Sequence, residues 1–318
     1  LFDTDMEMME NEYRHFDEDF KFETNFGYIN NYESSVSNKK KDIKFLFSKF
    51  EMDLKWSHFT KSNLFFNFEK TTNDTFLKVF DSNLSSDSVK PKNYDILTNE
   101  LKIELDNENY DFTAGLIAYE NLQEINSDRY QYILPYYNFN KNISDNFFNG
   151  TVAFNSSGSN DLNNTNNLRS LNINDISYFG KDIITSKGFK NNFNFYFKNL
   201  NSVGKKDVEY KSTPQIELMS ISELVTSLPL IKNSENYNNY LTPKLSLKFN
   251  PSDMKNYSDT NRPIRVDNIF NLNRLGLNDS FESGKSLTLG LNYKKEKLSD
   301  INKYFEIKLA TVLRNDKE

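Results

Sequence analysis

Apolar and polar residues alternate with a period of two along most of the chain. The clearest run has Phe50, Met52, Leu54 and Trp56 separated by charged residues. Successive side chains of a β-strand point to opposite faces of a sheet, so such a run gives a strand one apolar and one polar face. The same alternation recurs in residues 20–28, 101–105, 110–118, 193–197, 245–249, 287–293 and 305–309. The pattern predicts an all-β chain.

Clusters rich in Asn, Asp, Ser and Lys separate these segments and predict the connections between strands. The clusters are residues 30–42, 81–93, 155–167, 232–239 and 251–263. Asn and Asp favour turns because their side chains bond the nearby backbone and tolerate positive φ. Helical periodicity is scarce. In residues 218–228, the spacing of Leu218, Ile221, Val225 and Leu228 would fit one face of a helix. Pro229 and the flanking alternation make a strand equally consistent with the sequence. No repeat of 20–50 residues is present, which argues against propellers and solenoids.

Composition narrows the class of protein. The chain has 318 residues, of which 28 are Phe, 18 are Tyr and 47 are Asn, but only 37% are apolar. About 45–50% is usual for a soluble domain. No apolar run reaches about 18 residues, which excludes helical membrane spans. The net charge of -6 argues against nucleic acid as a partner, and the absence of Cys excludes disulfides and thiolate chemistry.

Two architectures accommodate a long all-β chain with one polar face. In a soluble sandwich or β-helix the apolar face forms a core, whereas in an outer-membrane barrel it meets lipid. Three observations favour the barrel. Tyr28, Tyr110 and Tyr293 stand at segment ends, the polar faces carry Lys, Glu and Asn, and a hydrated lumen needs no apolar core. An A+T-rich genome would also raise Phe, Tyr, Asn and Lys, so the soluble alternative stays open. We expect an antiparallel transmembrane β-barrel.

No set of residues predicts catalysis. His15 and His58 stand 43 residues apart and fit ordinary strand positions. Glu51 and Asp53 share a strand face, an arrangement that could serve a glycosidase but that also lines the lumen of a barrel. Residues 283–286 (Ser-Gly-Lys-Ser) end like a phosphate loop, but the first glycine of that motif is replaced by Asp279 and a strand follows. We therefore expect no enzyme, no metal site and no cofactor.

Seven motifs in the second half of the chain follow one another in a distinctive order. They are Asp128–Pro135, Ser227–Ile231, Tyr240–Pro251, Val266–Phe270, Asn273–Leu277, Asp279–Gly284 and Ser286–Tyr293. In this order they resemble the LptD family, the lipopolysaccharide-assembly outer-membrane proteins also called organic solvent tolerance proteins. The resemblance covers about residues 128–310, and the first hundred residues are similar only in style.

The resemblance implies a function. Members of the family form a very large barrel in the outer membrane of Gram-negative bacteria. The barrel receives lipopolysaccharide from a periplasmic bridge protein and inserts it into the outer leaflet. A plug lipoprotein sits inside, the lipid leaves through a lateral opening between the first and last strands, and a periplasmic jellyroll precedes the barrel. We therefore expect lipopolysaccharide, the plug lipoprotein and the bridge protein as partners, the last docking through a domain outside this chain.

The sequence also departs from the family. It has no recognisable jellyroll, no cysteines and no closing strand, and it opens at Leu1 without a signal peptide. We expect residues 1–318 to be part of one barrel domain and to supply about 12–16 strands of a larger barrel. Two other functions remain as alternatives: a general outer-membrane porin or channel, and a soluble β-rich glycan-binding protein.

The loop 266–276 holds most of the candidate site residues. Asp267, Asn268, Arg274 and Gly276 correspond by resemblance to an ordered loop folded toward the lumen. A turn held by its own side-chain bonds is the competing interpretation. Glu282 and Gly284 are expected to shape the next strand, with Gly284 allowing a bend or bulge.

Overall fold

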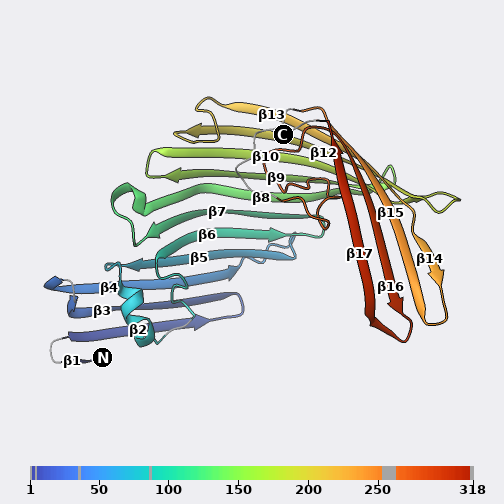
Figure 1. Ribbon diagram of the computed structural model, residues 1–318. Coiled ribbons are helices and arrows are strands. Elements are labelled where there is room, and N and C mark those ends of the chain that lie inside the picture. Colours follow the sequence, from blue (N-terminus) through green and yellow to red (C-terminus); the bar gives the residue numbers. More distant parts are fainter. Residues whose placement is uncertain (1, 4–5, 35–36, 86–87, 253–262, 316–318) are drawn as a thin grey trace. The chain divides into compact units, whose positions relative to one another are not determined.

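The computed structural model describes residues 2–3, 6–34, 37–85, 88–252 and 263–315. Strands dominate these residues (Figure 1). They are β1 (Phe2–Asp3), β2 (Met6–Phe16), β3 (Phe20–Ser34), β4 (Ser37–Asp53), β5 (Lys61–Thr71), β6 (Ile96–Asp106), β7 (Tyr110–Asn121), β8 (Tyr130–Phe147), β9 (Gly150–Asn163), β10 (Asn167–Gly180), β11 (Ile183–Ile184), β12 (Lys190–Lys205), β13 (Gln215–Ser227), β14 (Leu230–Asn233), β15 (Tyr237–Asn250), β16 (Gly284–Lys297) and β17 (Asp300–Arg314). The helical turns are α1 (Phe76–Phe80), η1 (Asp81–Asn83) and η2 (Asn126–Arg129).

The all-β prediction is confirmed. The strands belong to one antiparallel sheet, and within the described residues that sheet is not closed. Of the seventeen strand segments described, β1, β11 and β14 have four residues or fewer, and each of the other fourteen has at least eleven. The chain divides into two compact units. Unit 1 comprises Leu1–Asn140, Ser156–Asn172 and Ser202–Gln215; unit 2 comprises Lys141–Asn155, Ile173–Asn201 and Ile216–Glu318.

Several strands run further than the sequence pattern predicts. Most of cluster 30–42 belongs to β3 and β4, and cluster 155–167 forms the ends of β9 and β10 around a turn at residues 164–166. Ladder bonds join backbone groups whatever the side chains are, so Asn-rich segments can extend a hairpin. By contrast, β4 is shorter at its C-terminal end than the predicted run, which reached Trp56. It stops at Asp53 because Lys55 has a φ of 52°, which turns the chain. Cluster 251–263 falls largely outside the described residues.

In unit 1, β2 to β7 form a meander in which each strand pairs antiparallel with the next. The described residues of segment 72–95 between β5 and β6, which are 72–85 and 88–95, fold over one face of β3 and β4. Its Phe76 stacks on Phe45 of β4 with ring centroids 4.8 Å apart. Together with Leu77 and Phe80 these rings form the centre of a small apolar core. The sequence pattern predicts a connection at residues 81–93 but not the apolar core that this segment forms with the sheet.

Polar contacts also hold segment 72–95 on the sheet. The backbone N–H of Ser85 donates to both carboxylate oxygens of Glu10, at 3.1 and 3.2 Å. Farther along, the carbonyl oxygen of Ser88 accepts from the Lys49 ammonium. Within the segment, Lys90 lies 2.9 Å from Asp81, and its hydrogen bond holds the pKa of that carboxyl below its usual value. Core packing and surface charge therefore fix the segment together.

In unit 2, β13 and β14 act as one interrupted strand. Both pair with β15: Ser227 faces Lys244 and, past the interruption, Leu230 faces Leu241. The two registers are continuous across Pro229, which cannot donate a ladder bond because it has no N–H. β13 therefore replaces the helix that residues 218–228 could also have formed. β15, β16 and β17 continue the meander, drawn in orange and red in Figure 1.

Candidate functional site

Strand register gives β13, β15, β16 and β17 two faces of opposite chemistry. On one face Leu224, Leu247, Leu287 and Leu313 stand in a single cross-strand row. On the other face, one residue away along each strand, Glu223, Lys248, Ser286 and Arg314 form the matching row. Leu247 is 47% exposed, whereas its neighbours Ser246 and Lys248 are 0% and 5% exposed. The apolar face is therefore open and the polar face covered.

Residues 263–283, here called the polar-face loop, carry most of the predicted site residues. Two asparagines fold the loop locally. The Asn268 side-chain oxygen accepts the N–H of Arg265 at 2.7 Å, and the Asn273 amide donates to the carbonyl of Leu277 at 2.6 Å. Gly276 completes the second turn with a φ of 62°, a conformation that glycine adopts at little cost. These bonds shape the loop but do not attach it to the sheet.

Arg274 attaches the polar-face loop to β16. Its side chain is 1% exposed, its Nε forms an ion pair with Glu282, and its Nη1 donates to Oγ1 of Thr288 at 3.2 Å. The second carboxylate oxygen of Glu282 lies 2.7 Å from Nε of Arg314 on β17. A single carboxylate thus joins two guanidinium groups. Removing that carboxylate would leave Arg274 buried and uncompensated, which is costly in a low-dielectric site.

A second buried ion pair lies beside the first. The ammonium of Lys248 is 3.6 Å from Glu223, and both side chains are at most 3% exposed. Glu223 also accepts from Ser246 at 2.6 Å and from Asn194 on β12 at 3.0 Å. Lys248 donates to the carbonyl oxygen of Asn271 in the polar-face loop. The loop backbone therefore supplies part of the hydrogen bonding that a buried ammonium requires.

Aromatic rings of the polar-face loop cover the remaining polar side chains. Phe281 packs edge-on against Tyr196 with ring centroids 5.1 Å apart. The ammonium of Lys198 lies 5.4 Å from the centre of the Phe281 ring. Lys198 also pairs with Asp175 at 2.9 Å. Phe281 is 2% exposed. It excludes water from a lysine and an aspartate that are themselves paired.

Gly290 allows a second ring to approach β16. A Cβ at this position would lie 2.5 Å from Cζ of Phe270, well inside van der Waals contact. The ring of Phe270 therefore lies where any other residue would place its side chain, and Lys244 stands 4.4 Å from the ring centre. The small residue on the strand and the aromatic residue on the loop form a matched pair.

The structure separates the predicted residues into two groups. Arg274 and Glu282 meet in the ion pair described above. Asp267 is exposed in a turn, while Asn268 and Gly276 shape the turns of the loop. Gly284 opens β16 opposite Asn250 with a φ of 79°. The loop is thus held both by its own side-chain bonds and by charged residues of the sheet.

Five buried or half-buried charged residues of this site had no individual prediction: Asp175, Lys198, Glu223, Lys248 and Arg314. Lys198, Lys248 and Arg314 stand at polar positions of alternating strands, whereas Asp175 and Glu223 share their strand faces with apolar residues such as Ile173 and Ile221, so the sequence pattern does not mark them. Where alternation is present, it assigns a residue to one face of the sheet but does not identify its ion-pair partner. Their pairing depends on strand register and on the position at which the polar-face loop packs against the sheet.

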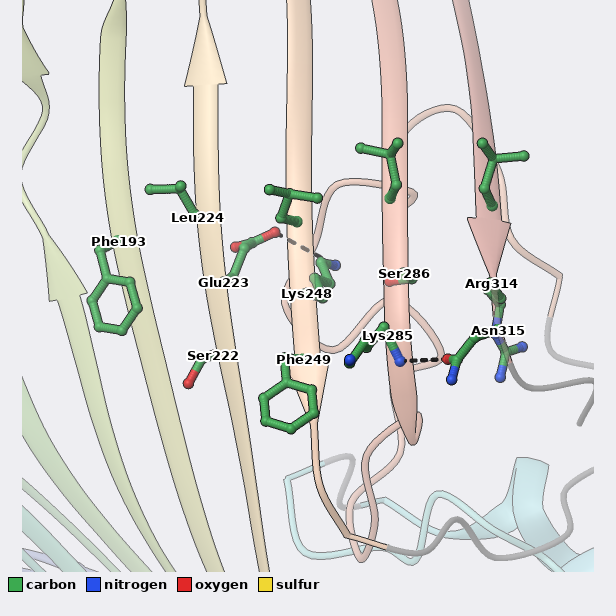
Figure 2. Close-up of a pocket in the computed structure, with 13 residues that line it drawn as sticks. Phe193, Ser222, Glu223, Leu224, Lys248, Phe249, Lys285, Ser286, Arg314 and Asn315 are labelled. Atoms are coloured by element: carbon green, nitrogen blue, oxygen red, sulfur yellow. Dashed lines mark hydrogen bonds and ion pairs between the residues drawn. The ribbon is translucent and has the colours of Figure 1, made fainter.

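The open, apolar face contains a groove of about 570 Å³ in unit 2. The four leucines of the cross-strand row line it together with Phe193 and Phe249. Figure 2 shows the small side chain of Ser222 between these two rings, with Lys285 beside Phe249. The backbone N–H of Lys285 donates to the side-chain oxygen of Asn315 at 2.6 Å. The groove is apolar along its length and polar at this end.

A lysine stands over an aromatic ring at each end of β16. Lys285 is 5.9 Å from the ring centre of Phe249, and Lys295 is 4.5 Å from that of Tyr237. Positions 285 and 295 have the same parity, so both lysines lie on the apolar face. This face therefore changes from charged and aromatic to aliphatic and back along one strand.

No protein-family model matches the chain, and no curated protein matches it. Within the residues that the structure describes, no group of three or more His, Asp or Glu side chains could hold a metal ion. No helix in the described ranges is long and apolar enough to cross a membrane.

Proposed function

We propose that this chain is a segment of an outer-membrane β-barrel that inserts lipopolysaccharide into the outer leaflet of a Gram-negative cell envelope. One observation carries the proposal: in unit 2 the exposed face of β13, β15, β16 and β17 is lined by large apolar side chains while charged side chains are buried on the opposite face, the reverse of a soluble protein. Soluble proteins usually bury apolar side chains and expose polar ones, so buried polar and exposed large apolar side chains indicate a different environment. Lipid around the apolar face would remove these apolar side chains from water.

In unit 1, β5 shows the same arrangement as the strands of unit 2. Phe50, Phe66, Leu101 and Leu116 stand in one cross-strand row, and the last three are 38–42% exposed. On the opposite face Asn67 and Glu69 are each 7% exposed. An apolar surface that extends over several strands is far larger than single exposed residues would make. In the proposal these rows meet the hydrocarbon core and the polar faces line the lumen.

The polar-face loop gives the lumen a shaped wall. Arg274 and Glu282 pair within the loop, and Thr288, Arg314 and Lys248 of the strands bond to it, so an ordered segment narrows the lumen. Moving an amphipathic lipid requires a hydrated path beside an apolar belt and no covalent chemistry. The proposal includes the partners that the resemblance implies: lipopolysaccharide, a plug lipoprotein in the lumen, and a bridge protein that docks outside this chain. It includes no nucleic acid.

Cysteine labelling in cells tests the membrane part of the proposal. The chain has no Cys, so single substitutions have no background. Leu289 and Leu291 are 40% and 41% exposed, and a soluble protein would expose cysteines there to a water-soluble maleimide. We expect Leu289→Cys and Leu291→Cys to resist that reagent until detergent is added, and Lys294→Cys on the polar face to react. Rapid labelling of both leucine positions in intact cells would refute the membrane assignment.

Depletion of the full-length protein separates lipid insertion from a general channel. Under the proposal, newly made lipopolysaccharide should fail to reach the cell surface, as measured by its accessibility to an impermeant oxidant of sugars. Uptake of small hydrophilic solutes should not fall. If solute uptake falls while surface lipopolysaccharide is unchanged, the protein is a channel and the insertion function is refuted.

A further inference from the structure

The groove on the apolar face of unit 2 has a built-in direction. Its floor is Ser222, and the larger side chains of Phe193, Leu224 and Phe249 rise around that position. A small residue among large ones leaves the depression. Its volume of about 570 Å³ lies inside the range of ligand sites, about 300–1,000 Å³. The shape is therefore a feature of side-chain size and not of a gap between strands.

Charge is confined to one end of the groove. Lys285 is exposed there, and its ammonium forms no ion pair with any carboxylate among the described residues. Arg314, at the same end, is already paired with Glu282 on the other face. The amide of Asn315 adds a neutral polar group beside Lys285. One unpaired positive charge and one amide thus face an otherwise aliphatic surface.

This order of groups follows the strands. Lys285 is the second residue of β16 and Asn315 follows the last residue of β17, so the polar end lies where the strands end. Ser222, Phe249 and Lys285 stand in one cross-strand row at this end, and Leu224, Leu247 and Leu287 form the next row toward the middle of the strands. A complementary ligand has one anionic group at the strand ends and a hydrocarbon chain along the leucines. That description fits a lipid with a single phosphate.

We propose that the groove holds one anionic glycerophospholipid from the surrounding bilayer. One acyl chain lies over Ser222 between Phe193 and Phe249, and the phosphate accepts a charge-assisted hydrogen bond from Lys285. The inference rests on the proposed membrane function, because only a bilayer supplies this ligand to the face. It differs from that function in naming a resident lipid and not the lipid that is transported.

Native mass spectrometry tests the inference on the full-length protein, purified from cell membranes in mild detergent and incubated with phosphatidylglycerol. We expect one tightly retained phosphatidylglycerol per protein. Loss of a charge-assisted hydrogen bond should lower affinity about tenfold or more in Lys285→Gln. Lys295→Gln is the matched control, because Lys295 lies on the same face of the same strand but lines no part of the groove. Its affinity should equal that of wild type.

A second pair of variants tests the groove itself. Ser222→Phe fills the floor and should remove the retained lipid, while Ser222→Ala keeps the depression and should retain it. A heat-dependent shift in gel mobility reports whether each variant is folded. Equal retention in Lys285→Gln and Lys295→Gln, retention by folded Ser222→Phe, or equal affinity for zwitterionic phosphatidylcholine would overturn the inference alone. Wild-type protein that is absent from the membrane fraction would overturn the proposed function and the inference together.

Discussion

Glu282→Gln should favour opening of the polar-face loop, because it leaves the guanidinium of Arg274 without a partner while that side chain is buried against the sheet. The carboxylate lies between Arg274, whose side chain is 1% exposed, and Arg314, whose side chain is 22% exposed. Removing one partner of a buried pair costs about 3–5 kcal/mol, whereas an exposed pair contributes about 0–1 kcal/mol. The Arg274 pair therefore dominates. We expect about 3 kcal/mol, because Arg274 keeps its hydrogen bond to Thr288.

This cost should appear as local opening and not as global unfolding. The loop can leave the sheet while the β15–β16 ladder stays intact, since that ladder does not include loop residues. A cost of 3 kcal/mol raises the open population roughly 100-fold. Trypsin cleavage after the buried Arg274 reports that population when opening is fast relative to cleavage. Cleavage after Arg265, which is exposed, serves as the internal reference.

Asp267→Asn is the matched control for Glu282→Gln. It makes the same change from acid to amide in the same loop, but at an exposed position, where substitutions usually change stability by less than about 0.5 kcal/mol. Its cleavage rate after Arg274 should stay within about twofold of wild type. If Glu282→Gln is cleaved no faster than Asp267→Asn, the buried ion pair does not hold the loop and the reasoning is wrong.

Three further outcomes follow from the structure. Leu289→Arg should lower folding stability in lipid vesicles by about 2–4 kcal/mol in urea titrations if it faces mid-membrane, against less than about 0.5 kcal/mol if it faces water. Gly290→Ala should displace Phe270 and cost about 1–3 kcal/mol, and adding Phe270→Ala should make the double variant less than additive; strict additivity would contradict the contact. Because Lys90 lowers the pKa of Asp81, their pairing contributes above about pH 4 and is lost as pH falls through the lowered pKa. Hydrogen exchange of α1 and η1 should therefore speed up at pH 3 relative to pH 5 after correction for intrinsic rates, and Asp81→Asn should remove that difference.

Period-two alternation predicts which residues share a face, because the side-chain period of a strand does not depend on its partner. It does not predict which residues meet across strands. Glu223 and Lys248 are 25 residues apart in sequence, and their pairing depends on the register of β13 with β15. Shifting that register by one residue would place Lys248 opposite Leu224 or Ser222, neither of which carries a charge. Alternation therefore gave the strands and the polar face, but not the ion pairs.

The covering segments were harder to predict than the strands. In segment 72–95 the apolar residues Phe76, Leu77 and Phe80 occupy five positions, too short a stretch for helical periodicity to be visible. In the polar-face loop, Arg274 and Glu282 were identified through resemblance, but nothing local indicates that Phe270 needs Gly290 twenty residues later. Both segments are fixed by contacts with distant strands.

The distance between the two lysines on the apolar face of β16 can be compared with the thickness of a membrane. Lys285 and Lys295 are ten residues apart, and an antiparallel strand rises about 3.4 Å per residue, so about 34 Å of strand separates them. With the tilt of about 35–45° usual in outer-membrane barrels, that length spans about 24–28 Å of height. The apolar band of such barrels is about 25 Å tall. Under the proposed function, the apolar part of β16 is as long as the hydrocarbon layer is thick. A lysine ammonium group and an aromatic ring then lie at each boundary between lipid and water.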